Sequence, residues 1–124
     1  MNPKVKIGLR ILFGVFALIF GINKFAAFLP AFEIPGDGGT LFGIYESSGF
    51  MKIIGVIEIL GGLALLAGKF VPMALVWLTA IMFNALLFHL LHDKAGIGGA
   101  ALGMILSLLL VFSYKDSMKC LFKS

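Results

Sequence analysis

The chain has 124 residues, of which 60% are apolar and 13% charged, and its mean hydropathy is +1.09. A domain of this size buries only about two-thirds of the surface that its unfolded chain exposes, so a water-soluble fold could not hide so much apolar surface. The formal charge of +4 is no nucleic-acid footprint, because the basic residues flank apolar runs instead of forming one cluster. The composition predicts an integral membrane protein that contacts the lipid bilayer and no nucleic acid.

Four apolar segments are long enough to cross a hydrocarbon layer of roughly 30 Å as helices. They cover residues 7–28, 49–67, 71–91 and 97–114. None of them alternates polar and apolar residues as the strands of a membrane barrel do. We therefore expect an all-α integral membrane four-helix bundle, with residues 1–124 forming a single transmembrane domain.

The stretch 29–48 is interrupted by prolines and glycines and cannot span the membrane, yet it is apolar and aromatic. We expect an apolar outer loop between the first two helices. It would lie at the membrane interface or fold back as a lid over the bundle mouth, with a short helical piece around 40–47.

The basic residues predict the orientation, since loops on the cytoplasmic side carry an excess of lysine and arginine. One side holds seven of them, and these are Lys4, Lys6, Arg10, Lys69, Lys115, Lys119 and Lys123. The other side holds three, which are Lys24, Lys52 and Lys94. Both termini are therefore expected in the cytoplasm.

Glu58 is the most informative single residue, because it lies near the middle of the second apolar segment. A carboxylate at that depth costs several kcal/mol unless it is paired, protonated or facing a wet cavity, so it indicates a functional site by default. Gly55 and Gly62 lie three and four residues away, on the same helix face. Small residues let helices approach closely in membranes, so Glu58 should face a neighbouring helix and not lipid.

Three more polar residues are predicted to lie in the same outer half of the bundle. Asn84 has a depth close to that of Glu58 and could hydrogen-bond to it, which would lower the cost of burying both. His89 follows near the end of the third helix. Lys24 lies near the outer end of the first helix, where it either extends to the interface or points inward. Lys24, Glu58, Asn84 and His89 form the candidate ligand-binding set, with Glu58 the best candidate for a catalytic group.

Several interpretations of this set stay open. It could hold a lipophilic redox carrier such as a quinone, with Glu58 or His89 exchanging protons with the head group. It could serve a proton-coupled small-solute transporter. His89, His92 and Asp93 are weak candidates for a metal site, because no second cluster of ligands accompanies them. Glu58 could also be a packing device, paired with Lys24 or Asn84. The single cysteine, Cys120, excludes a disulfide within the chain.

Several motifs together resemble the DoxX family of small membrane proteins. They are Gly-Ile-Asn-Lys-Phe (21–25), Phe-Leu-Pro-Ala-Phe-Glu-Ile-Pro (28–35), Gly-Val-Ile-Glu-Ile-Leu-Gly-Gly (55–62), Asn-Ala-Leu-Leu-Phe-His (84–89) and Asp-Lys-Ala-Gly-Ile (93–97). The resemblance implies a four-helix protein of the bacterial inner membrane. The family is named after a membrane part of a thiosulfate:quinone oxidoreductase, and other relatives are cargo receptors or receptor-assembly chaperones. Lys24, Glu58, Asn84 and His89 match the family pattern.

The leading hypothesis is therefore a redox-linked subunit that binds a quinone or a similar lipophilic molecule in a polar pocket opening outward. Such a subunit would have a membrane or redox protein as a partner, and it could form a homo-oligomer. The alternative is a non-catalytic membrane scaffold or assembly partner. In that case the glycine faces of the first and fourth helices should be the sensitive positions.

Overall fold

The computed structural model describes residues 2–26 and 34–122, and these residues form helices without any strand. In chain order the elements are α1 (Pro3–Ala26), α2 (Gly36–Ser47), α3 (Phe50–Ala67), α4 (Val71–His92), the 3₁₀ helix η1 (Lys94–Gly96), α5 (Ile97–Ser113) and the 3₁₀ helix η2 (Lys115–Phe122). The structure does not describe the side chains of Cys120, Lys123 and the loop residues 29–33.

Four stretches are long and apolar enough to cross a membrane, namely α1, α3, α4 and the continuous piece formed by η1 and α5, Lys94–Ser113. This confirms the predicted all-α membrane bundle. The first helix begins four residues earlier than predicted, at Pro3, because proline is well tolerated in the first turn of a helix. The last two residues of the predicted first segment, 27 and 28, lie outside the described part of the chain.

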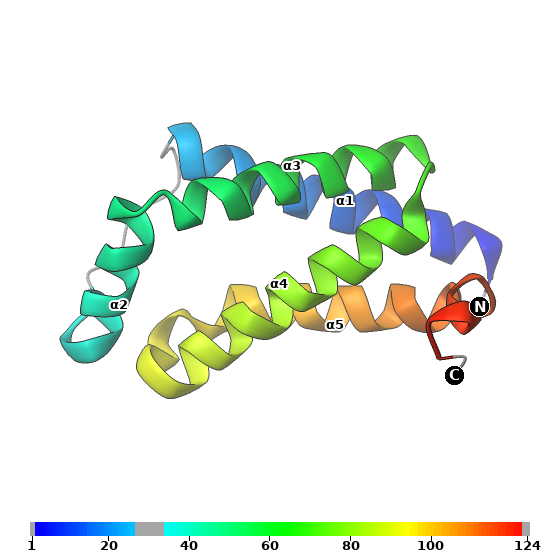
Figure 1. Cartoon of the computed structure of the whole chain (residues 1–124). Helices are drawn as coiled ribbons and strands as arrows, with labels where there is room; N and C mark the ends of the chain where they lie inside the picture. The colour runs from blue at the N-terminus through cyan, green and yellow to red at the C-terminus, as the bar shows by residue number, and fades with distance from the viewer. Residues whose placement is uncertain (1, 27–33, 123–124) are drawn as a thin grey trace.

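The bundle consists of two helix pairs, α1 with α3 and α4 with α5, and α4 also packs on α3 (Figure 1). The two ends of the chain lie at the same end of the bundle (Figure 1). There the Lys6 ammonium lies 3.9 Å from the ring centre of Tyr114 and so connects the start of α1 to the end of α5. The six described basic residues of the predicted cytoplasmic side, Lys4, Lys6, Arg10, Lys69, Lys115 and Lys119, belong to the helix ends and turns at this end.

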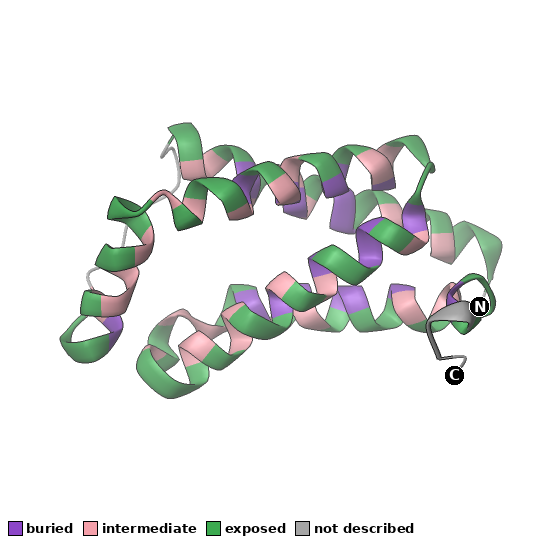
Figure 2. Cartoon of the chain, viewed as in Figure 1, coloured by how far each residue is buried: buried purple, intermediate pink, exposed green. Residues whose placement is uncertain are grey.

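Buried residues lie where the four long helices face one another, and exposed or intermediate residues make up the rest of each helix (Figure 2). The core contains Phe13, Ala17, Leu65, Leu75, Leu78, Leu106 and Leu110. Large apolar side chains cover the outside, among them Ile53, Leu60, Met73 and Phe112, each more than 60% exposed. Water would not favour such a surface, and a lipid bilayer is its natural environment.

Glycines bring α1 and α3 into backbone contact at two levels. A Cβ atom added to Gly62 would lie 2.8 Å from the carbonyl oxygen of Gly14, and one added to Gly21 would lie 2.9 Å from the carbonyl oxygen of Gly55. A real Cβ does not fit at these distances, so only glycine permits this packing. The predicted small faces of the two helices are thus used against each other inside the chain.

At the opposite end from the termini, α2 packs against the ends of α3 and α4 (Figure 1). A Cβ at buried Gly38 would lie 2.8 Å from the Cβ of His92, and the rings of Tyr45 and Phe50 stack 4.7 Å apart. This helix contains the short helical piece expected around 40–47 and extends it back to Gly36.

Candidate functional site

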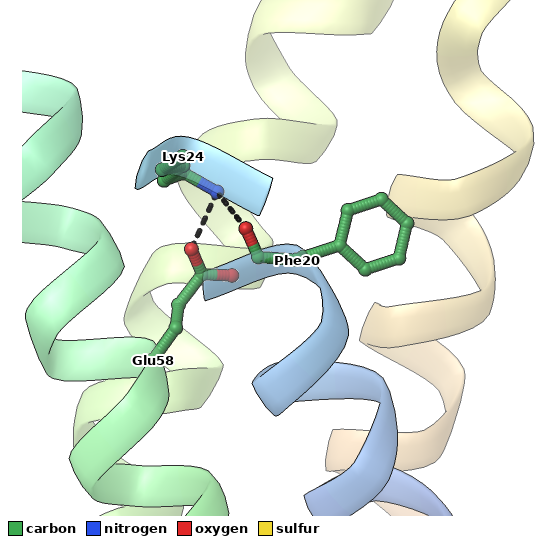
Figure 3. Close-up of polar contacts among 3 residues, drawn as sticks. All are labelled: Phe20, Lys24 and Glu58. Carbon is green, nitrogen blue, oxygen red and sulfur yellow. Dashed lines mark hydrogen bonds and ion pairs between the residues drawn. The ribbon is translucent and has the colours of Figure 1, made fainter. Parts of the chain in front are cut away.

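The candidate site is centred on an ion pair between α1 and α3 (Figure 3). The Nζ atom of Lys24 lies 2.5 Å from Oε1 of Glu58. The side chain of Glu58 is only 2% exposed, and that of Lys24 is 15% exposed. Of the two interpretations left open for Lys24, the structure supports the inward one.

The glycine contacts position this pair. Glu58 lies between Gly55 and Gly62 on the face of α3 that meets α1. A Cβ at Gly21 would lie 3.0 Å from the Cβ of Glu58, and one at Gly55 would lie 3.1 Å from the Cβ of Lys24. The absence of side chains at the two glycines therefore leaves the room in which the carboxylate and the ammonium meet.

The pair is not saturated with hydrogen bonds. Lys24 Nζ donates a long hydrogen bond of 3.4 Å to the carbonyl oxygen of Phe20 (Figure 3). Oε1 of Glu58 is enclosed and accepts no hydrogen bond of regular geometry, so its contact with Lys24 is an ion pair without an aligned hydrogen bond. An ammonium group has three N–H donors. With the carboxylate and the Phe20 carbonyl as its described partners, Lys24 retains one donor for another acceptor.

His89 lies near the end of α4 and is held by a different partner. Its Nδ1 atom lies 3.3 Å from Oδ2 of Asp93 and 3.2 Å from the Asp93 carbonyl oxygen. Gly96 fits closely against both side chains, since an added Cβ would lie 2.7 Å from Asp93 Oδ2. His89 therefore fixes the turn from α4 into α5, and no hydrogen bond or ion pair joins it to Lys24 or Glu58 in the described structure.

Asn84 lies on the exposed side of α4. At 100° per residue it is about 180° around the helix from Leu75, which is fully buried. None of the described residues forms a hydrogen bond with it, so the expected bond between Asn84 and Glu58 is not present. The structure brings together two of the four predicted ligand-binding residues, Lys24 and Glu58.

The weak metal candidates are also accounted for by other contacts. His92 is exposed, and its ring lies 5.7 Å from that of Phe88, while Asp93 pairs with His89. Among the described residues, no three histidine, cysteine, aspartate or glutamate side chains come together as a metal site would require.

Two apolar grooves, each of about 380 Å³, open on the surface of the bundle. One lies between α4 and α5, and the other between α3 and α4. Neither is lined by Lys24, Glu58 or His89. The expected polar pocket beneath the loop would involve residues 29–33, which lie outside the described part of the chain.

Sequence reasoning missed two partners in this region. The Phe20 carbonyl is a backbone group whose use as an acceptor leaves no signal in the sequence. The pairing of His89 with Asp93 could have been predicted from the sequence, because residues four apart on a helix are neighbours.

Four spanning helices around a buried ion pair define this chain as a multi-pass helical membrane protein. The model of the DoxX-like family matches residues 8–113, which is most of the chain, and the protein belongs to that family. The predicted resemblance is thereby confirmed. No curated protein and no solved structure matches the chain.

Proposed function

We propose that this protein is a redox-linked subunit of the bacterial inner membrane that binds a quinone or a similar lipophilic molecule next to Lys24 and Glu58. One observation carries the proposal, namely a buried and incompletely hydrogen-bonded lysine–glutamate pair inside an apolar bundle. Ionisable residues within membrane-spanning helices are costly, and they commonly belong to ligand sites or proton relays.

The chemistry of the pair suits a quinone head group. The remaining N–H donor of Lys24 can bind a carbonyl oxygen, and the Glu58 carboxylate can accept a proton. Interconversion of a quinone and its quinol moves two protons and two electrons. In this proposal Glu58 takes the two protons of the quinol one at a time and passes each on to water, and a partner redox protein accepts the two electrons.

The orientation is part of the proposal. The excess of basic residues at the end of the bundle that holds the termini favours a cytoplasmic location for both termini. Lys24 and His89 would then lie toward the outer side. His89, held by Asp93, would lie near the mouth of the site.

The test is to extract and identify by mass spectrometry the lipophilic molecules that co-purify with the protein in mild detergent. A quinone should be retained by the parent and by Glu46→Gln, which changes an exposed carboxylate on α2. It should be lost from Glu58→Gln and from the charge-free double variant Lys24→Met/Glu58→Gln. Thermal unfolding in the same detergent separates loss of ligand from loss of fold.

The proposal would be abandoned if Glu58→Gln and His89→Ala retained the ligand like the parent. Ordinary lipid alone in every sample would favour the scaffold or assembly partner, in which the ion pair only fixes helix packing.

The structure changes how the scaffold alternative can be tested. Gly14 and Gly21 of α1 contact α3, and Gly103 of α5 lies against Met82 and Phe16. Sensitivity of these glycines to substitution is therefore expected for any function. Glycine substitutions therefore do not distinguish a scaffold from the other functions, and a scaffold has to be identified by finding the protein partner that it binds. No described feature favours the small-solute transporter.

A further inference from the structure

The outward surface of α4 carries a regular line of six exposed side chains. Five are apolar and one, in the middle, is polar. We call this line the α4 stripe, and its members are Met73, Trp77, Ala80, Asn84, Leu87 and Leu91. The intervals alternate between four and three residues. This is the spacing of the seam along which two helices pack side by side with a left-handed twist.

Asn84 is the residue of the stripe that needs an explanation. It lies eight residues before the end of α4 at His92, or about 12 Å along the helix, which is inside the hydrocarbon layer if α4 spans it. A primary amide facing lipid at that depth has no water to bind. No described residue of the same chain bonds to it, and another molecule can supply the missing partner.

A second copy of the same chain supplies a matching partner. The side-chain amide is both a donor and an acceptor, so it is electrostatically complementary to an identical amide. If two α4 helices pack in parallel about a two-fold axis along the membrane normal, each Asn84 faces the other Asn84. In an antiparallel pair the two amides would be offset along the helices, because Asn84 is nearer to one end of α4.

The surroundings of the stripe fit this arrangement. Ala80, one turn from Asn84, is small enough to let two helices approach closely. An apolar groove lies on each side of α4, one including Val76 and Phe83 and the other including Met73 and Trp77. The helix thus forms a ridge between two grooves, and each groove can receive bulky side chains of the partner.

We propose that two copies of this chain associate in parallel through the α4 stripe, with their Asn84 side chains hydrogen-bonded to each other across the two-fold axis. The proposal does not depend on the ligand or on the redox role. It assigns Asn84 to the interface between two copies, and the Lys24–Glu58 pair remains inside each copy.

The test is disulfide cross-linking in native membranes with the full chain. Cys120 is replaced by serine, and a single cysteine is introduced at Ala80 in the stripe. The matched control is Leu109→Cys, because Leu109 is exposed and lies twelve residues from the start of α5 at Ile97, as Ala80 lies twelve residues from the end of α4 at His92. Each version is then combined with Asn84→Leu, which removes the amide, and with Asn84→Gln, which keeps it.

We expect dimers from Ala80→Cys and none above background from Leu109→Cys. Asn84→Leu should lower the dimerisation constant about tenfold, the order expected for lost interhelical hydrogen bonds, and Asn84→Gln should largely preserve it. Subunit counting in bilayer discs should give two copies for the parent. Equal cross-linking at both positions, no response to Asn84→Leu, or capture of a different protein at Ala80 would each overturn the proposal.

Discussion

The α1–α3 interface and the outward surface of α4 both carry polar side chains at membrane depth, and they differ in where those side chains find partners. In the first, glycines bring two helices into backbone contact, and Glu58 meets Lys24 within the chain. On the second, bulky apolar residues surround Asn84, and no described residue of the chain bonds to it.

The two regions show two different roles that polar side chains can have in a membrane protein. A charge pair enclosed between close helices is a property of the single chain and is available for chemistry or for packing. An amide that faces lipid can form hydrogen bonds only with a group of another molecule. Substitutions in the two regions should therefore affect different measurements.

The largest effect is expected from removing one member of the ion pair. Lys24→Met or Glu58→Leu alone leaves an enclosed charge without its partner, which should lower the free energy of unfolding by about 3 to 5 kcal/mol. The double variant removes both charges and should return to within about 1 kcal/mol of the parent. Unfolding by a denaturing detergent in mixed micelles, followed by helix content, measures this. Lys52→Met, which changes an exposed lysine of α3, is the control. A double variant as unstable as the sum of the singles would contradict the coupling.

The glycine contact should come next. Gly62→Val places a side chain against the Gly14 backbone, which cannot move aside without separating α1 from α3, so a loss of about 3 kcal/mol is expected. Gly8→Val is the matched control, because nothing lies within 4 Å of a Cβ at Gly8. The same unfolding assay applies. Equal stability of the two variants would show that the backbone contact is not required.

A smaller effect is expected where α5 packs on α4. A Cβ at Gly103 would overlap the sulfur of Met82 and lie 2.9 Å from the ring of Phe16, but both obstacles are ends of side chains, and the methionine is flexible. Gly103→Ala should therefore cost about 1 kcal/mol. Gly98→Ala has open space around the new methyl group and should be neutral or slightly stabilising. A loss as large as that of Gly62→Val would mean that the side chains of Met82 and Phe16 cannot move aside.

The smallest effect on the fold is expected on the α4 stripe. Trp77 is 54% exposed, so Trp77→Leu should change the free energy of unfolding of a single chain by no more than about 0.5 kcal/mol. It should nevertheless reduce cross-linking through Ala80→Cys, because the indole belongs to the stripe. Leu102→Ala, an equally exposed change on α5, should affect neither measurement. A large loss of stability for Trp77→Leu would place that side chain in the core of the single chain.

Much of this architecture is predictable from the sequence. An apolar run of spanning length forms a helix in lipid, because a helix satisfies its backbone hydrogen bonds within the segment. Three of the four predicted spans agree with the structure to within one residue at each end. The inward direction of Glu58 was also predictable, because Gly55 and Gly62 mark its face as the packed one.

The direction of Asn84 was not predictable for a physical reason. In a water-soluble helix, the apolar face identifies the inside. On α4, large apolar residues lie on every side, because lipid and core are equally apolar. A hydrophobicity pattern therefore cannot distinguish the buried Leu75 from the exposed Trp77. The sequence of α4 also contains no glycine to mark its packed face. Sequence position alone placed Asn84 and His89 in the same half of the bundle, but it did not show which side of α4 faces α3.

The chain order of the ion pair has a consequence for biogenesis. A glutamate at the centre of a helix opposes insertion into the membrane by roughly 3 kcal/mol, the order measured for charged residues at that position. Because α1 precedes α3 in the chain, Lys24 leaves the ribosome before Glu58 does. The first helix can thus assist insertion of the second spanning helix, and a chain without Lys24 should fail earliest at this step, before any ligand is bound.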